Sequence, residues 1–143
     1  MCKYLFVYGT LRPAIVREEL RWLIEMLKPI GRATVRGRLY DLGEYPGAVL
    51  DPQCHTLVVG DLLELPANEQ IVAALDEYEG CVEGDPDASL FVRSRCWVRL
   101  DDGREIESWI YLYNRDVSSA TLIPKGDYVN AYNHKDWEDW REG

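Results

Sequence analysis

Hydrophobic and polar positions change their spacing along the chain, and each change marks a predicted element. The run from Tyr4 to Val7 is continuously apolar and runs into a glycine turn at Gly9, which is the pattern of a short buried strand. Between Ile15 and Lys28, apolar residues recur at helical spacing with charged residues opposite them. This spacing predicts an amphipathic helix that Pro29 ends.

The middle of the chain predicts strands and then a second helix. From Ile30 to Leu65 the sequence is rich in Val, Leu and Tyr and is divided by Gly, Pro and Asp, which predicts three or four strands. After Pro66 a helical spacing returns over residues 67–80, with Gly80 placed as its C-terminal stop.

Two alternating runs beyond residue 90 predict a β-hairpin around the turn at residues 101–104. One face is expected to hold Val92, Ser94, Cys96, Val98 and Leu100 from the first strand and Ile106, Ser108, Ile110 and Leu112 from the second. The order of strand, helix, strands, helix and strands predicts a single α+β domain over residues 1–143. We expect two main helices and a mostly antiparallel, barrel-like mixed sheet.

The net charge and the hydropathy of the chain argue against two classes of partner, nucleic acids and membranes. The formal net charge is −9 at pH 7, whereas nucleic acids and anionic membranes attract clustered Lys and Arg. No stretch approaches the ~20 apolar residues that span a bilayer. We therefore expect no nucleic acid and no membrane as a partner, and the sequence does not predict the oligomeric state.

The cysteines bear on the cellular compartment. Cys2, Cys54, Cys81 and Cys96 contain no C-x-x-C pair, and the first predicted strand is not preceded by the apolar run of about 7–15 residues that a signal peptide needs. Such usage is typical of reduced thiols. The expected localisation is cytoplasmic.

Standard catalytic and cofactor motifs are absent from the sequence. His55 and His134 have no neighbours at metal-ligand spacing, and the chain holds no glycine-rich nucleotide loop and no G-x-S-x-G elbow. We therefore expect no metal and no organic cofactor. A Cys–His nucleophile pair stays open, because such partners meet only in the folded chain.

Two other stretches carry candidate chemistry. Gly9 lets the backbone approach a ligand, and successive N–H groups in such a turn can hold an anion; the alternative is that Gly9 merely ends a strand. Residues 75–80 read L-D-E-Y-E-G, which places carboxylates at the end of the helix dipole that disfavours them. Those carboxylates are either well solvated or kept for some task.

Four motifs follow one another along the chain: F-V-Y-G-T-L-R-P, G-R-L-Y-D-L-G-E-Y-P-G-A-V, L-D-E-Y-E-G, and G-D before an aromatic residue in P-K-G-D-Y. They recur in that order and at similar separations in the gamma-glutamylcyclotransferase-like family, which the chain resembles over roughly Tyr4 to Tyr128. The family includes gamma-glutamylamine cyclotransferases and plant avirulence-induced proteins. The resemblance implies the fold of that family.

The resemblance also implies an enzyme that releases 5-oxoproline from a small gamma-glutamyl amine or amino acid. The substrate's own α-amine attacks its γ-carbonyl, so the protein mainly folds the substrate into an attacking geometry. An α-amino group has a pKa of about 8 and needs a base before it attacks. The family's catalytic glutamate corresponds to Glu79, expected to act as general base and then acid. Asp76 and Glu77 are expected to be solvated charges.

Substrate contacts are implied in the same way. Backbone N–H groups of the first turn would hold the gamma-glutamyl portion and stabilise the oxyanion, while Tyr8 has the alternative role of a core aromatic. Family members commonly carry Tyr-x-Arg where this chain has Phe91-Val92-Arg93, so one hydroxyl is lost. Pro46 is expected beside Tyr45 in a pocket wall. The expected substrate-binding residues are Tyr8, Gly9, Thr10, Leu11, Tyr45 and Arg93.

A second hypothesis is a non-catalytic module that binds a small molecule or a partner through the same pocket. Glu79 favours the enzyme, whereas the missing hydroxyl and the tail with Trp137 and Trp140 favour some specialisation. Those tryptophans either dock a partner or pack across the domain. The acidic loop at residues 83–89 would favour a cationic leaving amine.

Overall fold

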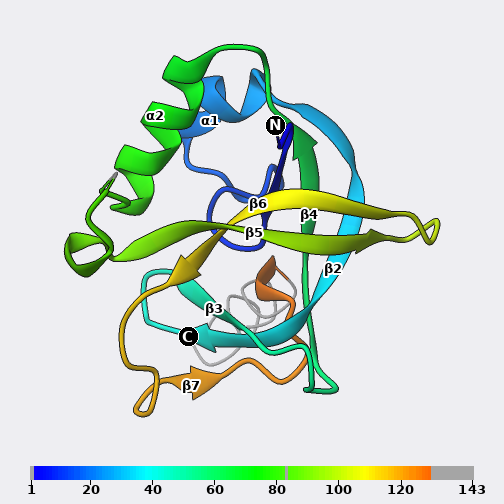
Figure 1. Ribbon diagram of the computed structural model, residues 1–143, viewed down its shortest axis with the longest axis vertical. Helices are drawn as coiled ribbons and strands as arrows, with labels where there is room; N and C mark the ends of the chain where they lie inside the picture. The colour runs from blue at the N-terminus through cyan, green and yellow to red at the C-terminus, as the bar shows by residue number, and fades with distance from the viewer. Residues whose placement is uncertain (1, 83, 130–143) are drawn as a thin grey trace, which may run out of the picture.

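The computed structural model describes residues 2–82 and 84–129, and Figure 1 shows a curved sheet with both helices gathered on one side of it. The strands are β1 (Tyr4–Val7), β2 (Lys28–Asp41), β3 (Pro46–Leu50), β4 (Leu57–Glu64), β5 (Phe91–Leu100), β6 (Glu105–Tyr113) and β7 (Thr121–Leu122). The helices are α1 (Glu18–Glu25), α2 (Glu69–Glu79) and a short 3-10 helix, η1 (Pro86–Ala88).

Five strands close on themselves into a barrel-like sheet. Their order is β2-β4-β1-β6-β5, and β5 returns to β2 through the pairs Ala33–Leu100 and Thr34–Arg99. β3 and β7 both pair with β2. β1 runs parallel to β6, and the other pairs between described strands are antiparallel. The predicted α+β fold with a mostly antiparallel, barrel-like mixed sheet is therefore confirmed.

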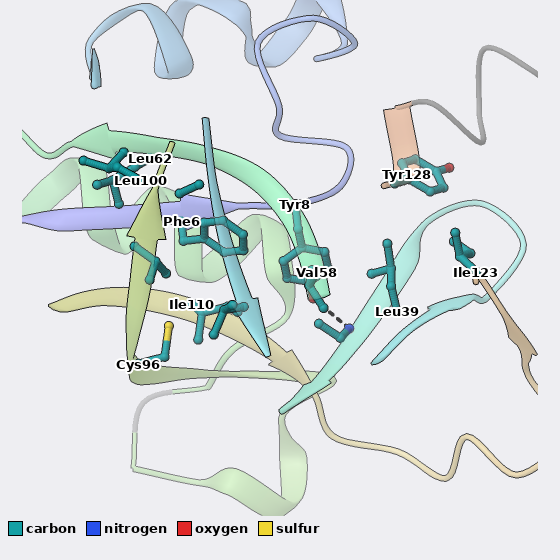
Figure 2. Close-up of a cluster of buried hydrophobic side chains, with 14 residues drawn as sticks. Phe6, Tyr8, Leu39, Val58, Leu62, Cys96, Leu100, Ile110, Ile123 and Tyr128 are labelled. Carbon is teal, nitrogen blue, oxygen red and sulfur yellow. Dashed lines mark hydrogen bonds between the residues drawn. The ribbon is translucent and has the colours of Figure 1, made fainter. Parts of the chain in front are cut away.

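Apolar side chains cover both faces of the barrel wall, which explains why β1 is apolar throughout. Phe6 points into the barrel, where Figure 2 shows it beside Leu62 and Ile110. Leu5 and Val7 belong instead to the cluster that packs the sheet against the two helices. A strand buried on both faces has no solvent side on which polar residues would alternate.

The first helix is shorter than the sequence predicts. α1 ends at Glu25, and Pro29, which we expected to end the helix, lies in β2 opposite Leu63 of β4. The helix needs only its short span to bury Leu23 and Ile24 against the sheet. Pairing with β4 then determines the conformation of the next residues, so tertiary structure overrides the local helical spacing.

The second helix and the hairpin follow the prediction closely. The side chain of Asn68 accepts a hydrogen bond from the Gln70 N–H before α2, and Gly80 ends the helix with a φ of 69°. In the hairpin, Cys96 pairs with Ser108 and Val98 with Ile106, so residues that were predicted to share a face do so.

Some predictions fall outside these elements. His134, Trp137 and Trp140 lie outside the described residues, so their roles stay predictions. Within residues 2–82 and 84–129, no helix is both long enough and apolar enough to cross a membrane. All four cysteines are free thiols.

Candidate active site

A cavity of about 290 Å³ lies where the end of β1 meets the end of α2. Segments far apart in the sequence form most of its wall: Tyr8–Leu11 after β1, Glu44–Pro46 at the start of β3, Glu77–Gly80 at the end of α2, and Leu90, Phe91 and Tyr111 from the hairpin region. The two stretches that carried candidate chemistry in the sequence therefore face one cavity.

The turn after β1 fits closely against Pro46, the first residue of β3. The Arg12 N–H donates to the Gly9 carbonyl at 3.0 Å, which closes the turn. A Cβ added at Gly9 would lie 2.6 Å from Pro46 Cγ, closer than two carbon atoms can approach without a shift. On its other side, Thr10 Oγ1 lies 2.9 Å from the hydroxyl of Tyr78, so a hydrogen bond joins the turn to α2. Gly9 is therefore required by close packing of the cavity wall.

Glu79 is the last residue of α2 and lines this cavity, partly buried. Burial raises its pKa from 4.5 to about 8, because an ionised carboxylate loses hydration there. No cation of residues 2–82 and 84–129 forms an ion pair with it. Glu79 can therefore take up and release a proton near neutral pH.

Two tyrosine hydroxyls beside the cavity donate hydrogen bonds to acceptors within the protein. Tyr8 Oη donates to the Tyr111 carbonyl at 2.6 Å and accepts from the Ala48 N–H at 3.2 Å, the bond drawn in Figure 2. Tyr111 Oη donates to Asp76 Oδ1 at 2.6 Å. Burial, reinforced by nearby carboxylates, raises the pKa of both phenols. The cavity wall within the described residues includes no Cys or His, which leaves Glu79 as its group that titrates near neutral pH.

Asp76 differs from its expected role, and Arg93 makes its contacts within the protein. Asp76 is not a solvated charge: its carboxylate binds Arg93 Nε at 2.9 Å and is 15% exposed. Arg93, which we expected to contact substrate, does not line the cavity and lies over the Trp109 ring at 4.4 Å. Glu77 is exposed, as expected. The arginine is used inside the protein because its strand faces the helix flank that carries Asp76.

A second buried ion pair supports the turn, and the sequence reading missed it. Arg12 donates from Nε to Asp61 Oδ2 at 3.0 Å and from Nη1 to Asp127 Oδ1 at 2.9 Å. The side chain of Arg12 is 9% exposed. Arg12 and Asp127 belong to two of the quoted motifs, F-V-Y-G-T-L-R-P and P-K-G-D-Y. Their positions in these motifs were the sequence feature that could have indicated the ion pair. These bonds join the turn to β4 and to the G-D segment.

A family model described as gamma-glutamyl cyclotransferase, AIG2-like, matches residues 5–130. The chain belongs to this family. Membership makes it an enzyme of cyclotransferase type, and the resemblance drawn from the sequence motifs is confirmed.

Individual relatives of this AIG2-like chain agree with the family match. A Methanocaldococcus jannaschii protein named "Putative gamma-glutamylcyclotransferase" is 29% identical over 126 residues, which cover 88% of this chain and 95% of that one. The crystal structure of a mouse AIG2-like protein has a TM-score of 0.68 at 20% identity, covering 88% of this chain and 87% of that chain. YkqA of Bacillus subtilis has a TM-score of 0.64 at 26% identity; 90% of this chain matches 40% of that longer protein.

Most site residues expected of an AIG2-like cyclotransferase meet at the cavity. Tyr8, Gly9, Thr10, Leu11, Tyr45 and Glu79 all line it. Tyr8 also belongs to the barrel core, which was its alternative expected role. Phe91 lines the cavity and packs edge-on against Tyr45 at 5.7 Å, which gives an aromatic wall where the family hydroxyl is missing. Substrate contact by these residues stays a prediction.

The acidic loop after α2 is described from residue 84 onward. Its described residues, 84–89, do not line the wall. The charged residues that line it besides Glu79 are Arg17, Glu44 and Glu77, all exposed. Residues 84–89 therefore lend no support to a cationic leaving amine.

Substitution of Gly9 by Ala is expected to lower cyclotransferase kcat/KM by about 10- to 100-fold, because the new Cβ would push the turn away from Pro46. The rate is compared with that of a Gly9→Ala, Pro46→Ala double variant, which lacks the colliding ring atoms and should recover part of the loss. Wild-type activity in the single variant would show that the packing of the turn is unimportant.

Glu79 is expected to make stability depend on pH. Its folded-state pKa of about 8 exceeds the ordinary value of 4.5, so the native state binds this proton more tightly than the unfolded chain. Its contribution to the free energy of unfolding is therefore full below about pH 4.5 and is lost as the pH rises through about 8. Urea unfolding is measured at pH 5 and pH 9. Between these pH values, wild type should lose at least ~1 kcal/mol more of its free energy of unfolding than Glu79→Gln loses. Glu69→Gln, an exposed change in the first turn of α2, should show the same change in the free energy of unfolding between these pH values as wild type.

Proposed function

We propose that the chain releases 5-oxoproline from a small gamma-glutamyl amine or amino acid by attack of the substrate α-amine on its own γ-carbonyl. The observation that carries this proposal is the position of Glu79, a carboxylate with a pKa of about 8, in a cavity that the Gly9 turn bounds. Family membership supports the same reaction class.

Glu79 acts as the proton carrier. In the ionised state it accepts a proton from the substrate ammonium, and the neutral amine then forms a C–N bond to the γ-carbonyl carbon. The tetrahedral intermediate collapses as its bond to the leaving nitrogen breaks and Glu79 returns the proton to that nitrogen. The ring nitrogen loses its second proton as the lactam forms, and the leaving amine takes up an equivalent one. No water or cofactor enters the balance.

The raised pKa of Glu79 suits this exchange. The α-amine of the substrate has a pKa of about 8 in water, and that of Glu79 is also about 8. Proton transfer between matched groups costs little free energy in either direction, so one residue can serve as base and then as acid. A solvated glutamate would be too weak a base for this task.

The turn supplies the second requirement, stabilisation of the oxyanion. Four consecutive residues of the turn line the cavity, Tyr8, Gly9, Thr10 and Leu11, so backbone N–H groups are available in its wall. Tyr8 and Tyr111 donate their hydroxyl protons to protein acceptors, so they shape the cavity and do not supply a proton. We assign oxyanion stabilisation to the backbone of the turn.

The cavity suits a small substrate. Its volume of about 290 Å³ is at the lower end of the range for small-molecule sites. Tyr45 and Phe91 offer an apolar wall, while Arg17, Glu44 and Glu77 offer charges of both signs at the surface. The identity of the leaving amine is therefore to be determined by testing a panel of gamma-glutamyl compounds as substrates. The cytoplasmic location also stays a prediction.

Incubation with a panel of gamma-glutamyl amino acids and amines tests the proposal, with 5-oxoproline measured by mass spectrometry. Samples without protein correct for spontaneous cyclisation. We expect product from at least one panel member, with kcat/KM highest near pH 8. It should fall at lower pH, where Glu79 is already protonated, and at higher pH, where the substrate amine has lost the proton that Glu79 passes to the leaving nitrogen. Absence of product, with panel members still raising the melting temperature, would replace the enzyme by the binding module.

A further inference from the structure

The carboxylate of Asp76, three residues before Glu79 in α2, is bound from two strands. Arg93 of β5 donates from Nε to Oδ1 at 2.9 Å and from Nη2 to Oδ2 at 3.4 Å. Tyr111 of β6 donates its hydroxyl proton to Oδ1 at 2.6 Å. The ion pair is largely shielded, with side-chain exposures of 24% for Arg93 and 15% for Asp76. One carboxylate thus ties the last turns of α2 to the hairpin.

The other contacts between α2 and the sheet are mainly apolar. Ile71 and Leu75 pack into the cluster that contains Leu5 and Leu63. Apolar burial is non-directional, so it holds the helix against the sheet without setting the rotation of its last turn. Charge-assisted hydrogen bonds have a defined geometry and can set that rotation. The bonds to Asp76, together with the hydrogen bond between Tyr78 and Thr10, therefore help to set where the next helical turn, with Glu79, is placed.

Arg93 is itself fixed in place. Its guanidinium carbon lies 4.4 Å from the centre of the Trp109 ring, a cation–π contact on the strand next to it. Arg95 lies over the same ring at 5.0 Å. The arginine thus has a stacked aromatic partner and a carboxylate partner, both within the protein.

The ion pair also controls charge near Glu79. Residues three apart on a helix are neighbours, about 5–6 Å between Cβ atoms, so Asp76 lies beside Glu79. Tyr111 connects the two electrostatically, since both carboxylates contribute to the raised pKa of its phenol. Arg93 offsets the negative charge of Asp76. The net charge next to Glu79 is therefore close to zero, whereas an unpaired Asp76 would place a second negative charge there.

We propose that Asp76, Arg93 and Tyr111 form a positioning unit that fixes the last turn of α2, with Arg93 cancelling the charge of Asp76 beside Glu79. None of the three is a catalytic residue here, because the unit acts through Glu79. Its effect on turnover rests on the proposed function, whereas its effect on the ionisation of Glu79 does not.

The other groups that face Glu79 are unchanged in the Asp76 and Arg93 variants below. Tyr8, which follows β1, and Tyr111 of β6 border it as neutral phenols with raised pKa values. Three exposed charged residues line the same cavity: Arg17 before α1, Glu44 before β3 and Glu77 in α2. Tyr45 and Tyr78 complete the titratable wall. The comparison therefore isolates the charges of Asp76 and Arg93.

Titration of the Glu79 carboxyl by carbon NMR, in protein labelled with ¹³C-glutamate, tests the unit without any substrate. The signal is assigned by its absence from Glu79→Gln. Asp76→Asn leaves Arg93 unbalanced and should move the midpoint down by about one pH unit; Arg93→Gln leaves Asp76 unbalanced and should move it up by a similar amount. The Asp76→Asn, Arg93→Gln double variant should return close to wild type. Arg99→Gln, at an exposed ion pair on the same strand, is the control and should not move it.

Turnover and folding are measured beside the titration. Tyr111→Phe removes one bond to Asp76 without changing charge, so kcat should fall about 10-fold with KM within about 3-fold, while the Glu79 midpoint stays in place. Circular dichroism identifies any variant that fails to fold, and the remaining variants still decide the sign of the shifts. Coincident midpoints in all folded variants would overturn the positioning unit. Opposite midpoint shifts in a wild-type protein that releases no 5-oxoproline would uphold the unit and reject the proposed function.

Discussion

Glu79→Gln is expected to reduce the release of 5-oxoproline by about 10²- to 10⁴-fold, the range by which a positioned general acid–base accelerates a reaction. Glutamine has nearly the same shape but no proton to exchange at neutral pH. The substrate ammonium would then have to lose its proton to water before ring closure. The cavity itself should persist, because no hydrogen bond or ion pair in the described part of the chain depends on the Glu79 carboxylate.

The loss is measured as kcat for the best substrate of the panel, by quantifying 5-oxoproline over time. Glu69→Gln, the same chemical change in the exposed first turn of α2, serves as the matched control and should keep wild-type activity. Glu79→Asp should keep a small part of the rate, since it retains the carboxylate but withdraws it by one methylene. A Glu79→Gln variant with near wild-type turnover would assign the proton transfer to another group.

Arg12→Met is expected to lower the free energy of unfolding by about 3 kcal/mol, the lower end of the range for breaking a buried ion pair. Asp61 and Asp127 would lose the cation that they share while staying 28% and 23% exposed. Their partial exposure allows some rehydration, which keeps the loss below that of a fully buried pair. The turn at Gly9 would also lose its attachment to β4, so activity should fall with stability.

Urea unfolding at neutral pH measures this loss, and Arg32→Met provides the comparison. Arg32 pairs with Asp101 at 3.2 Å, but both side chains are more than half exposed. Its removal should cost less than ~1 kcal/mol, as is usual for a surface pair. Equal losses in the two variants would contradict a special role for the Arg12 cluster.

Features that depend on neighbouring residues in the sequence were predicted correctly, whereas features that depend on residues far apart in the chain were not. α2 and the hairpin were predicted well because caps, turn residues and alternation are local signals. The end of α1 was wrong because the pairing of Pro29 with Leu63 depends on a strand that comes much later in the chain. Short-range patterns contain no information about such pairing.

The site shows the same division. The Gly9 turn and Glu79 could be named from motifs, and the structure brings them to one cavity. Asp76 was misread as a solvated charge because its partners, Arg93 and Tyr111, are 17 and 35 residues away. Arg12 was overlooked for the same reason, since Asp61 and Asp127 are 49 and 115 residues away. An arginine that neutralises a buried carboxylate cannot be told from a substrate-binding arginine by sequence alone.

The parallel pairing of β1 with β6 has a consequence for biosynthesis. Leu5 stands opposite Trp109, and the hydroxyl of Tyr8 reaches the carbonyl of Tyr111 across 103 residues. During translation the Gly9 turn leaves the ribosome long before the strand that completes its cavity. Contacts of such long range form slowly and leave apolar β1 in need of protection while synthesis continues. Competence for catalysis is therefore expected to arise late, when β6 has emerged, and not gradually as the chain grows.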